Sequence, residues 1–75
     1  MADDTEIAAQ RARWQVDTAE QVAWDAQALV TELRKGGDAD RAIEVGEEAL
    51  GHWPNFEPLR TAVAWAFYQR DLKPI

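Results

Sequence analysis

Cysteine and serine are absent from this 75-residue chain, and histidine occurs once. Without cysteine the chain forms neither disulfides nor thiolate metal sites, which fits a reducing compartment, so we expect a cytoplasmic protein. A bacterial periplasm stays open on this criterion. Nucleophilic and acid–base catalysis need convergent groups, such as a histidine beside a serine or a cysteine, and this composition does not supply them. The sequence therefore predicts a protein that is not an enzyme.

Long apolar runs and a basic leader are also missing. No segment approaches the roughly 20 apolar residues of a membrane-spanning helix, and the first ten residues, MADDTEIAAQ, are acidic where a secretory signal is basic. Fourteen acids against eight bases give a net charge of −6. Because nucleic-acid affinity comes largely from neutralising phosphates, this charge disfavours DNA and RNA. We expect neither a membrane nor a nucleic-acid partner.

Metal and phosphate motifs are lacking as well. Asp38, Asp40 and Glu44 have no accompanying loop of oxygen ligands and no turn glycine of the kind that a calcium site requires. The pair Gly36-Gly37 is followed by neither Lys-Ser nor Lys-Thr, so it is not a phosphate-binding loop. We predict no metal and no cofactor.

The main pattern in the sequence is apolar residues at helical spacing. Neither glycine nor proline occurs between Ala2 and Lys35, and apolar residues recur there every three or four positions. The stripe consists of Ala19, Val22, Ala23, Ala26, Leu29, Val30 and Leu33. No segment alternates with period two long enough to predict a strand. The expected fold class is all-α.

The length of the first helical region is open. The apolar stripe continues backward through Val16, Ala12 and Ala8 or Ala9, which would allow one helix from residue 4 to residue 35. Against this, Asp17 and Thr18 stand three residues before Glu20 and Gln21, and both pairs have the spacing of a capping box. We favour a break near residue 17.

Turn residues divide the remainder of the chain. Gly36-Gly37 is suited to the left-handed end of a helix, and Asp38 is suited to cap the next one. Pro54 stops that helix, Asn55 is the expected cap of the last, and Pro58 falls in its first turn. The sequence thus predicts a single domain over residues 1–75, built of antiparallel helical hairpins. Its four helices are expected near 4–16, 18–35, 39–52 and 56–71.

The stretch from Gly37 to Tyr68 reads GDADRAIEVGEEALGHWPNFEPLRTAVAWAFY. Its glycine turn, its small-to-apolar helix face and its closing Trp53-Pro54-Asn55 resemble the centre of a tetratricopeptide-repeat (TPR) array. Residues 23–56 match one repeat of about 34 residues, and residues 57–70 match the first helix of the next. The resemblance therefore spans about one and a half repeats over residues 23–70. It implies a scaffold that mediates protein–protein contact.

Three residues depart from the TPR pattern. Ala26 stands where the family favours tryptophan, Val30 where it favours a small residue, and Gly46 where it favours a large apolar one. Ala42 and Ala49 match the close-contact positions of the second helix. The departures bear on how the helices cross, and through that on the shape of any groove between them.

In TPR proteins the first helix of each repeat lines the concave, ligand-binding side, so the resemblance implies a groove between residues 18–35 and 56–71. The candidate partner-binding residues are Trp24, Gln27, Thr31, Arg34, Lys35, Thr61, Trp65, Tyr68 and Gln69. Tryptophan and tyrosine anchor interfaces because they bury a large area with few rotors. We expect a protein or peptide partner that places aliphatic side chains on the aromatic rings and an acidic group near the two bases.

The last helix also supports another interpretation, because Trp65, Tyr68 and Leu72 lie on a different side from its main apolar stripe. Either the chain is a fragment of a longer multidomain protein, or this face meets a second copy in a homodimer through the C-terminal helix. In the first case Trp65 and Tyr68 pack on a following helix, and Trp24 covers the N-terminal helix around Trp14. The alternative function is a structural domain that drives homo-oligomerisation or positions a catalytic domain of a larger protein.

Overall fold

Four α-helices make up the computed structural model, which describes residues 3–72. Within that range it contains no strand, and the predicted all-α class is confirmed. The helices are α1 (Asp4–Trp14), α2 (Glu20–Lys35), α3 (Ala39–His52) and α4 (Glu57–Asp71).

The expected break between the first two helices is confirmed, but its chemistry differs from the prediction. The N-cap of α2 is Ala19, whose side chain caps nothing, so neither capping box forms. The carboxylate of Asp17 instead accepts from the backbone N–H of Ala19 at 3.1 Å, which holds the loop rather than the helix end. The proposed backward continuation of the stripe is also wrong, because Val16 is 86% exposed. The buried face of α1 carries Ile7 and Trp14 instead.

The two remaining turns lie where the sequence predicts them, but at each turn one predicted role falls to a different residue. Gly37 takes a φ of 90°, which favours glycine, whereas Gly36 keeps a right-handed conformation. The carboxylate of Asp38 caps α3 by accepting from the N–H of Arg41, as predicted. At the start of α4 the N-cap is Phe56 and not Asn55, since the chain makes one further turn before the helix begins.

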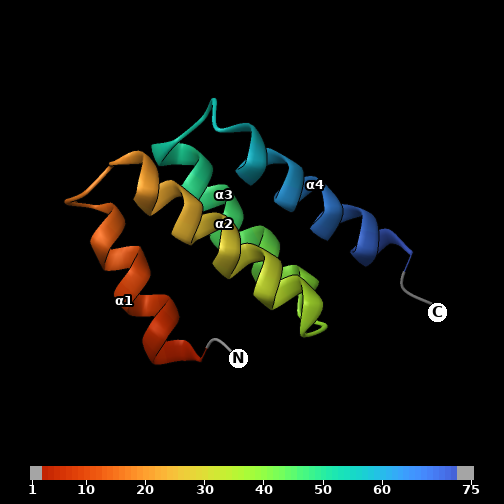
Figure 1. Ribbon diagram of the computed structural model, residues 1–75. Helices are drawn as coiled ribbons and strands as arrows, with labels where there is room; N and C mark the ends of the chain where they lie inside the picture. The colour runs from red at the N-terminus through yellow and green to blue at the C-terminus, as the bar shows by residue number, and fades with distance from the viewer. Residues whose placement is uncertain (1–2, 73–75) are drawn as a thin grey trace.

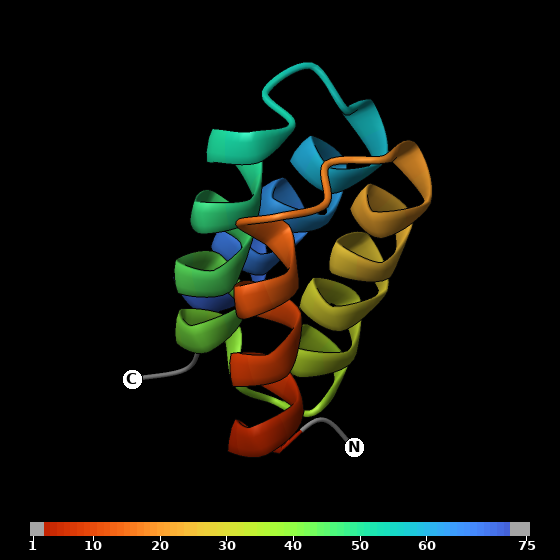
Figure 2. The same ribbon diagram turned by 90° about the vertical axis from the view of Figure 1, so that its left-hand side faces the viewer.

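The helices pack around α3 and α2. Figure 1 shows α3 running back along α2, and α4 running in the direction of α2. Figure 2 shows α1 in front of the α2–α3 pair, on the side away from α4. Both α2 and α3 contact α1 and α4. The core therefore lies on two sides of one helical pair. Its largest fully buried side chains are Trp14, Ile7, Leu29, Leu59, Val22, Val30 and Val45.

Gly46 lets α3 approach the helices on both of its sides. A Cβ atom added there would overlap Cγ2 of Val63 in α4 and would lie 3.4 Å from Cγ2 of Val30 in α2. Ala42 and Ala49 are fully buried on the same helix, so small residues occupy the whole contact. The space beside Gly46 is filled chiefly by Val63 of α4, with Val30 of α2 in ordinary contact on the other side.

We predict that Gly46→Ala lowers the free energy of unfolding by about 1–3 kcal/mol, because overpacking outweighs the gain in helix propensity. The matched control is Gly51→Ala in the same helix, where an added Cβ meets nothing within 4 Å. That variant should be unchanged or about 0.5 kcal/mol more stable. Urea denaturation followed by circular dichroism measures both. Equal stability of the two variants would contradict the close contact.

Candidate functional site

An open groove of about 460 Å³ lies between α2 and α4. Six of the nine candidate residues line it, namely Gln27, Thr31, Arg34, Lys35, Thr61 and Trp65. They come together because positions three or four apart on a helix share a face, and the α2 set spans two turns of that face. The structure thus places in one groove residues from two helices that the sequence separates by more than 25 positions.

The other three candidates lie outside the lining of the groove, each with a defined contact. Trp24 is half-exposed and packs edge-on against Phe56, with ring centroids 5.0 Å apart. The ring contact of Trp24 is thus with the residue that caps α4. Tyr68 is half-exposed and packs edge-on against Trp65 at 5.6 Å. Gln69 donates from Nε2 to the backbone oxygen of Arg34 at 3.0 Å, which ties α4 to the end of α2.

Three lining residues were missing from the sequence prediction: Glu57, Pro58 and Ala62. Extending the helical face of Thr61 backward by one turn would have found Glu57 and Pro58, since they lie four and three positions before it. Glu57 accepts from Nη1 of Arg60 at 3.2 Å, which neutralises the acidic end of the groove. The remaining polar groups of the wall are a hydrogen-bonded pair on α2, in which Gln27 Nε2 donates to Thr31 Oγ1 at 3.1 Å.

The opposite end of the groove is basic and unneutralised. Every other arginine in residues 3–72 has a carboxylate oxygen within 4.0 Å, whereas Arg34 and Lys35 have none there. The Nε atom of Arg34 is also buried without a hydrogen-bond partner. Both residues lie in the last turn of α2, where cations interact favourably with the helix dipole. This end of the groove can therefore accept a negatively charged group.

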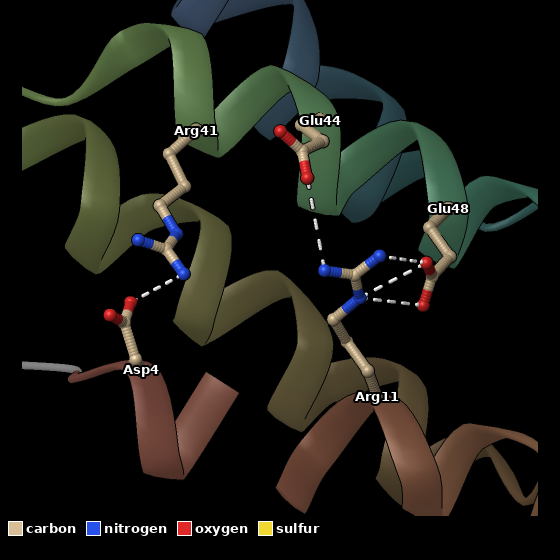
Figure 3. A network of polar contacts seen from close by, with 5 residues as sticks. All are labelled: Asp4, Arg11, Arg41, Glu44 and Glu48. Carbon is tan, nitrogen blue, oxygen red and sulfur yellow. Dashed lines mark hydrogen bonds and ion pairs between the residues drawn. The ribbon is translucent and has the colours of Figure 1, made fainter. Parts of the chain in front are cut away.

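Five charged side chains hold α1 against α3 (Figure 3). The Nε atom of Arg11 donates to both carboxylate oxygens of Glu48 at 3.0 Å, and its Nη1 lies 3.8 Å from Glu44. Near the start of α1, Asp4 pairs with Arg41. The hydrogen bonds from Arg11 lower the pKa of Glu48 and in turn raise the pKa of Arg11. These groups are occupied by one another, so their role is to dock α1.

The rings of Trp14, His52 and Trp53 pack together where α1 and α3 end. Trp14 is fully buried and packs edge-on against Trp53, with centroids 6.1 Å apart. The indole N–H of Trp53 donates to the backbone oxygen of Thr18 at 2.9 Å, which fixes the α1–α2 loop. The ring of His52 lies 6.3 Å from that of Trp14. Among residues 3–72, no group of three or more His, Asp or Glu side chains is placed to hold a metal ion.

We predict that Glu48→Gln lowers the free energy of unfolding at pH 7 by about 0.5–1 kcal/mol, as expected for a partly exposed ion pair. Because folding lowers the pKa of Glu48 below its ordinary value of 4.5, the contribution of the pair is present above that pH. It is lost as the pH falls through the folded-state pKa. Urea denaturation across this range should therefore show the variant and the parent converging in acid.

Glu47→Gln serves as the control for this experiment, because Glu47 is the exposed neighbour on the same helix. Its free energy of unfolding should stay close to that of the parent both at pH 7 and in acid. A difference between Glu48→Gln and the parent that persists undiminished at acid pH would contradict the ion-pair account.

No helix among residues 3–72 is long and apolar enough to cross a membrane. No protein-family model, curated protein or solved structure matches the chain.

Proposed function

We propose that the chain is a non-catalytic, TPR-like interaction module that binds a peptide or a segment of a partner protein between α2 and α4. The observation that carries this proposal is the groove itself, which has the half-exposed ring of Trp65 in its lining and a basic end with no carboxylate partner among residues 3–72. Trp65 and Tyr68 are 53% and 56% exposed, and large rigid side chains of this kind anchor partners at low entropic cost. We also propose a cytoplasmic location, on the lack of cysteine.

The packing of the helices supports the repeat assignment over residues 23–70. Both α2 and α4 pack on α3 and flank the same groove, as the first helices of two successive repeats would. On this proposal α2 and α3 form one repeat, and α4 is the first helix of the next. The groove then corresponds to the concave side on which such repeats bind their ligands.

The charge at the end of α2 specifies one part of the ligand. The guanidinium of Arg34 is half-buried, its Nε lacks a partner, and Lys35 extends the positive end into solvent. A carboxylate placed at this end would form a charge-assisted hydrogen bond with the Arg34 guanidinium or the Lys35 ammonium, which is stronger than a neutral one. We therefore propose a ligand with an apolar portion on Trp65 and an acidic group at Arg34.

The test starts with selection of binding peptides from a random display library on the immobilised full chain. Trp65→Ala should weaken the selected peptides by at least about tenfold, since hot-spot truncations cost about 2 kcal/mol or more. The urea midpoint should stay unchanged, because Trp65 is half-exposed. Arg34→Gln should weaken the acidic peptides selectively. Calorimetric titration measures the affinities.

Two matched variants serve as controls for these measurements. Val16→Ala trims an exposed apolar residue away from the groove, and Arg13→Gln removes a paired surface cation on α1. Neither should alter the affinity of the peptides. Selected peptides that bind Trp65→Ala as tightly as the parent, or a loss of affinity that follows a loss of stability, would refute the groove proposal.

Self-association is a second candidate function, and the outer face of α4 favours it. Trp65, Tyr68 and Leu72 lie three and four positions apart and are all more than half exposed. Terminal helices of repeat arrays usually have a polar outer face, so an aromatic one suits contact with a second copy. The net charge of −6 opposes such contact at low salt, because like charges repel.

For this candidate we expect sedimentation velocity to show a dimer whose population rises with protein concentration and with salt, which screens the repulsion. Tyr68→Glu should restore the monomer, whereas Val16→Glu, at an exposed position on the opposite side of the molecule, should leave the dimer intact. A monomer at every concentration and every salt level would exclude self-association through α4.

A further inference from the structure

We infer that the ligand of the α2–α4 groove is an extended, proline-rich segment with one or two acidic residues at the Arg34 end. This inference rests on the proposed peptide-binding function and goes beyond it, because it assigns the conformation and the chemistry of the occupant. Three features of the groove lead to it: its polar lining, its unpaired hydrogen-bond donors and its sparse positive charge.

The polar lining favours an extended backbone over a helix. Gln27 and Thr31 on α2 and Thr61 on α4 place amide and hydroxyl groups along both walls. A bound α-helix satisfies its own N–H and C=O groups internally and offers these walls no backbone partner. An extended segment leaves its carbonyl groups free along its whole length. It can therefore hydrogen-bond to both helices at once.

The donors near the groove favour a ligand that is rich in acceptors. Within residues 3–72, no protein group accepts a hydrogen bond from the indole N–H groups of Trp24 and Trp65 or from the hydroxyl of Tyr68, and all three residues are about half exposed. Trp65 lines the groove, whereas Trp24 and Tyr68 lie outside its lining. Indole is a donor only, so it selects carbonyl oxygens. On the acceptor side, the carboxylate of Glu57 is already paired with Arg60. A groove with spare donors suits proline, which has a carbonyl group and no N–H.

The exposed aromatic rings and the net charge of the chain also favour a proline-rich ligand with few acidic residues. Trp24 and Trp65 are each packed edge-on by one neighbouring ring, Phe56 and Tyr68, and both remain about half exposed. Exposed tryptophan and tyrosine rings are the surfaces on which polyproline II segments dock, and such segments lose little entropy because they are already extended. With a net charge of −6, the chain repels a strongly acidic ligand, so the two cations suit one or two acids.

Nuclear magnetic resonance of the four indole N–H groups tests this inference directly. The probe is an acetylated, amidated polyproline peptide ending in two aspartates, added to the ¹⁵N-labelled full chain. It should shift and saturate the signals of Trp24 and Trp65. The signals of Trp14 and Trp53 should stay in place, because one indole is fully buried and the other donates to Thr18. The unaffected pair is an internal control for general effects of the peptide.

Two further probes match the first in length and charge: a glycine–serine peptide and an alanine-rich helical peptide, each ending in two aspartates. The proline probe should bind at least about tenfold more tightly than either. Trp65→Phe keeps a ring but removes the donor, and it should weaken the proline probe about three- to tenfold, the usual effect of losing one hydrogen bond. Val16→Ala should change nothing.

The outcomes separate this inference from the proposed function. Equal or tighter binding of the helical or the glycine–serine probe, with the same two indole signals shifted, would overturn the proline assignment and leave the peptide groove standing. The proline assignment also falls if library-selected peptides shift the signals of Trp24 and Trp65 while the proline probe does not. If neither the selected peptides nor any probe moves those signals, both proposals fall.

Discussion

The close approach of α3 to α2 and α4 at Gly46 is the contact on which the remaining geometry depends. Because Gly46 has no side chain, Val30 and Val63 reach the same point from opposite helices, and α2 and α4 are held at a fixed separation. The hydrogen bond from Gln69 to the backbone of Arg34 sets that separation again at the far end. The groove is therefore defined by the packing beneath it, while Trp65 and Lys35 in its lining stay exposed to solvent.

The two sides of the α2–α3 pair use charge in opposite ways. On the α1 side, Arg11 of α1 pairs with Glu44 and Glu48 of α3, Arg41 of α3 pairs with Asp4 of α1, and Trp14 is fully buried in the aromatic cluster. On the α4 side, Arg34 and Lys35 have no carboxylate among the described residues. On the α1 side, groups of the chain thus satisfy one another. The α4 side has hydrogen-bond donors, cations and exposed ring faces that no group among residues 3–72 satisfies. This asymmetry separates the structural part of the molecule from the part suited to a partner.

Helical periodicity predicts much of this arrangement, because it depends only on local spacing. The buried stripes of α2 and α4 were found in this way, whereas the candidate face of α2 from Gln27 to Lys35 came from the resemblance to TPR proteins. Periodicity fails where tertiary contacts decide, as on α1, where Arg11 and Trp14 face the core and Val16 points to solvent. The helix starts at Ala19 and Phe56 lack side-chain caps, so the exact cap residue cannot be found from the sequence, although Pro58 marks the first turn of α4. The contact of Trp24 with Phe56 joins two distant segments and leaves no pattern in the sequence.

The hydrogen bond between Trp53 and Thr18 bears on the order in which the helices fold. Thr18 and Trp53 are 35 positions apart, and Arg11 and Glu48 are 37 apart, so the residues that hold α1 are made long after α1 itself. A helix of 11 residues is too short to persist alone in water. As the chain leaves the ribosome, its first helix therefore waits for the end of α3 to emerge. Helix α1 therefore reaches its native contacts only after the end of α3 has been made.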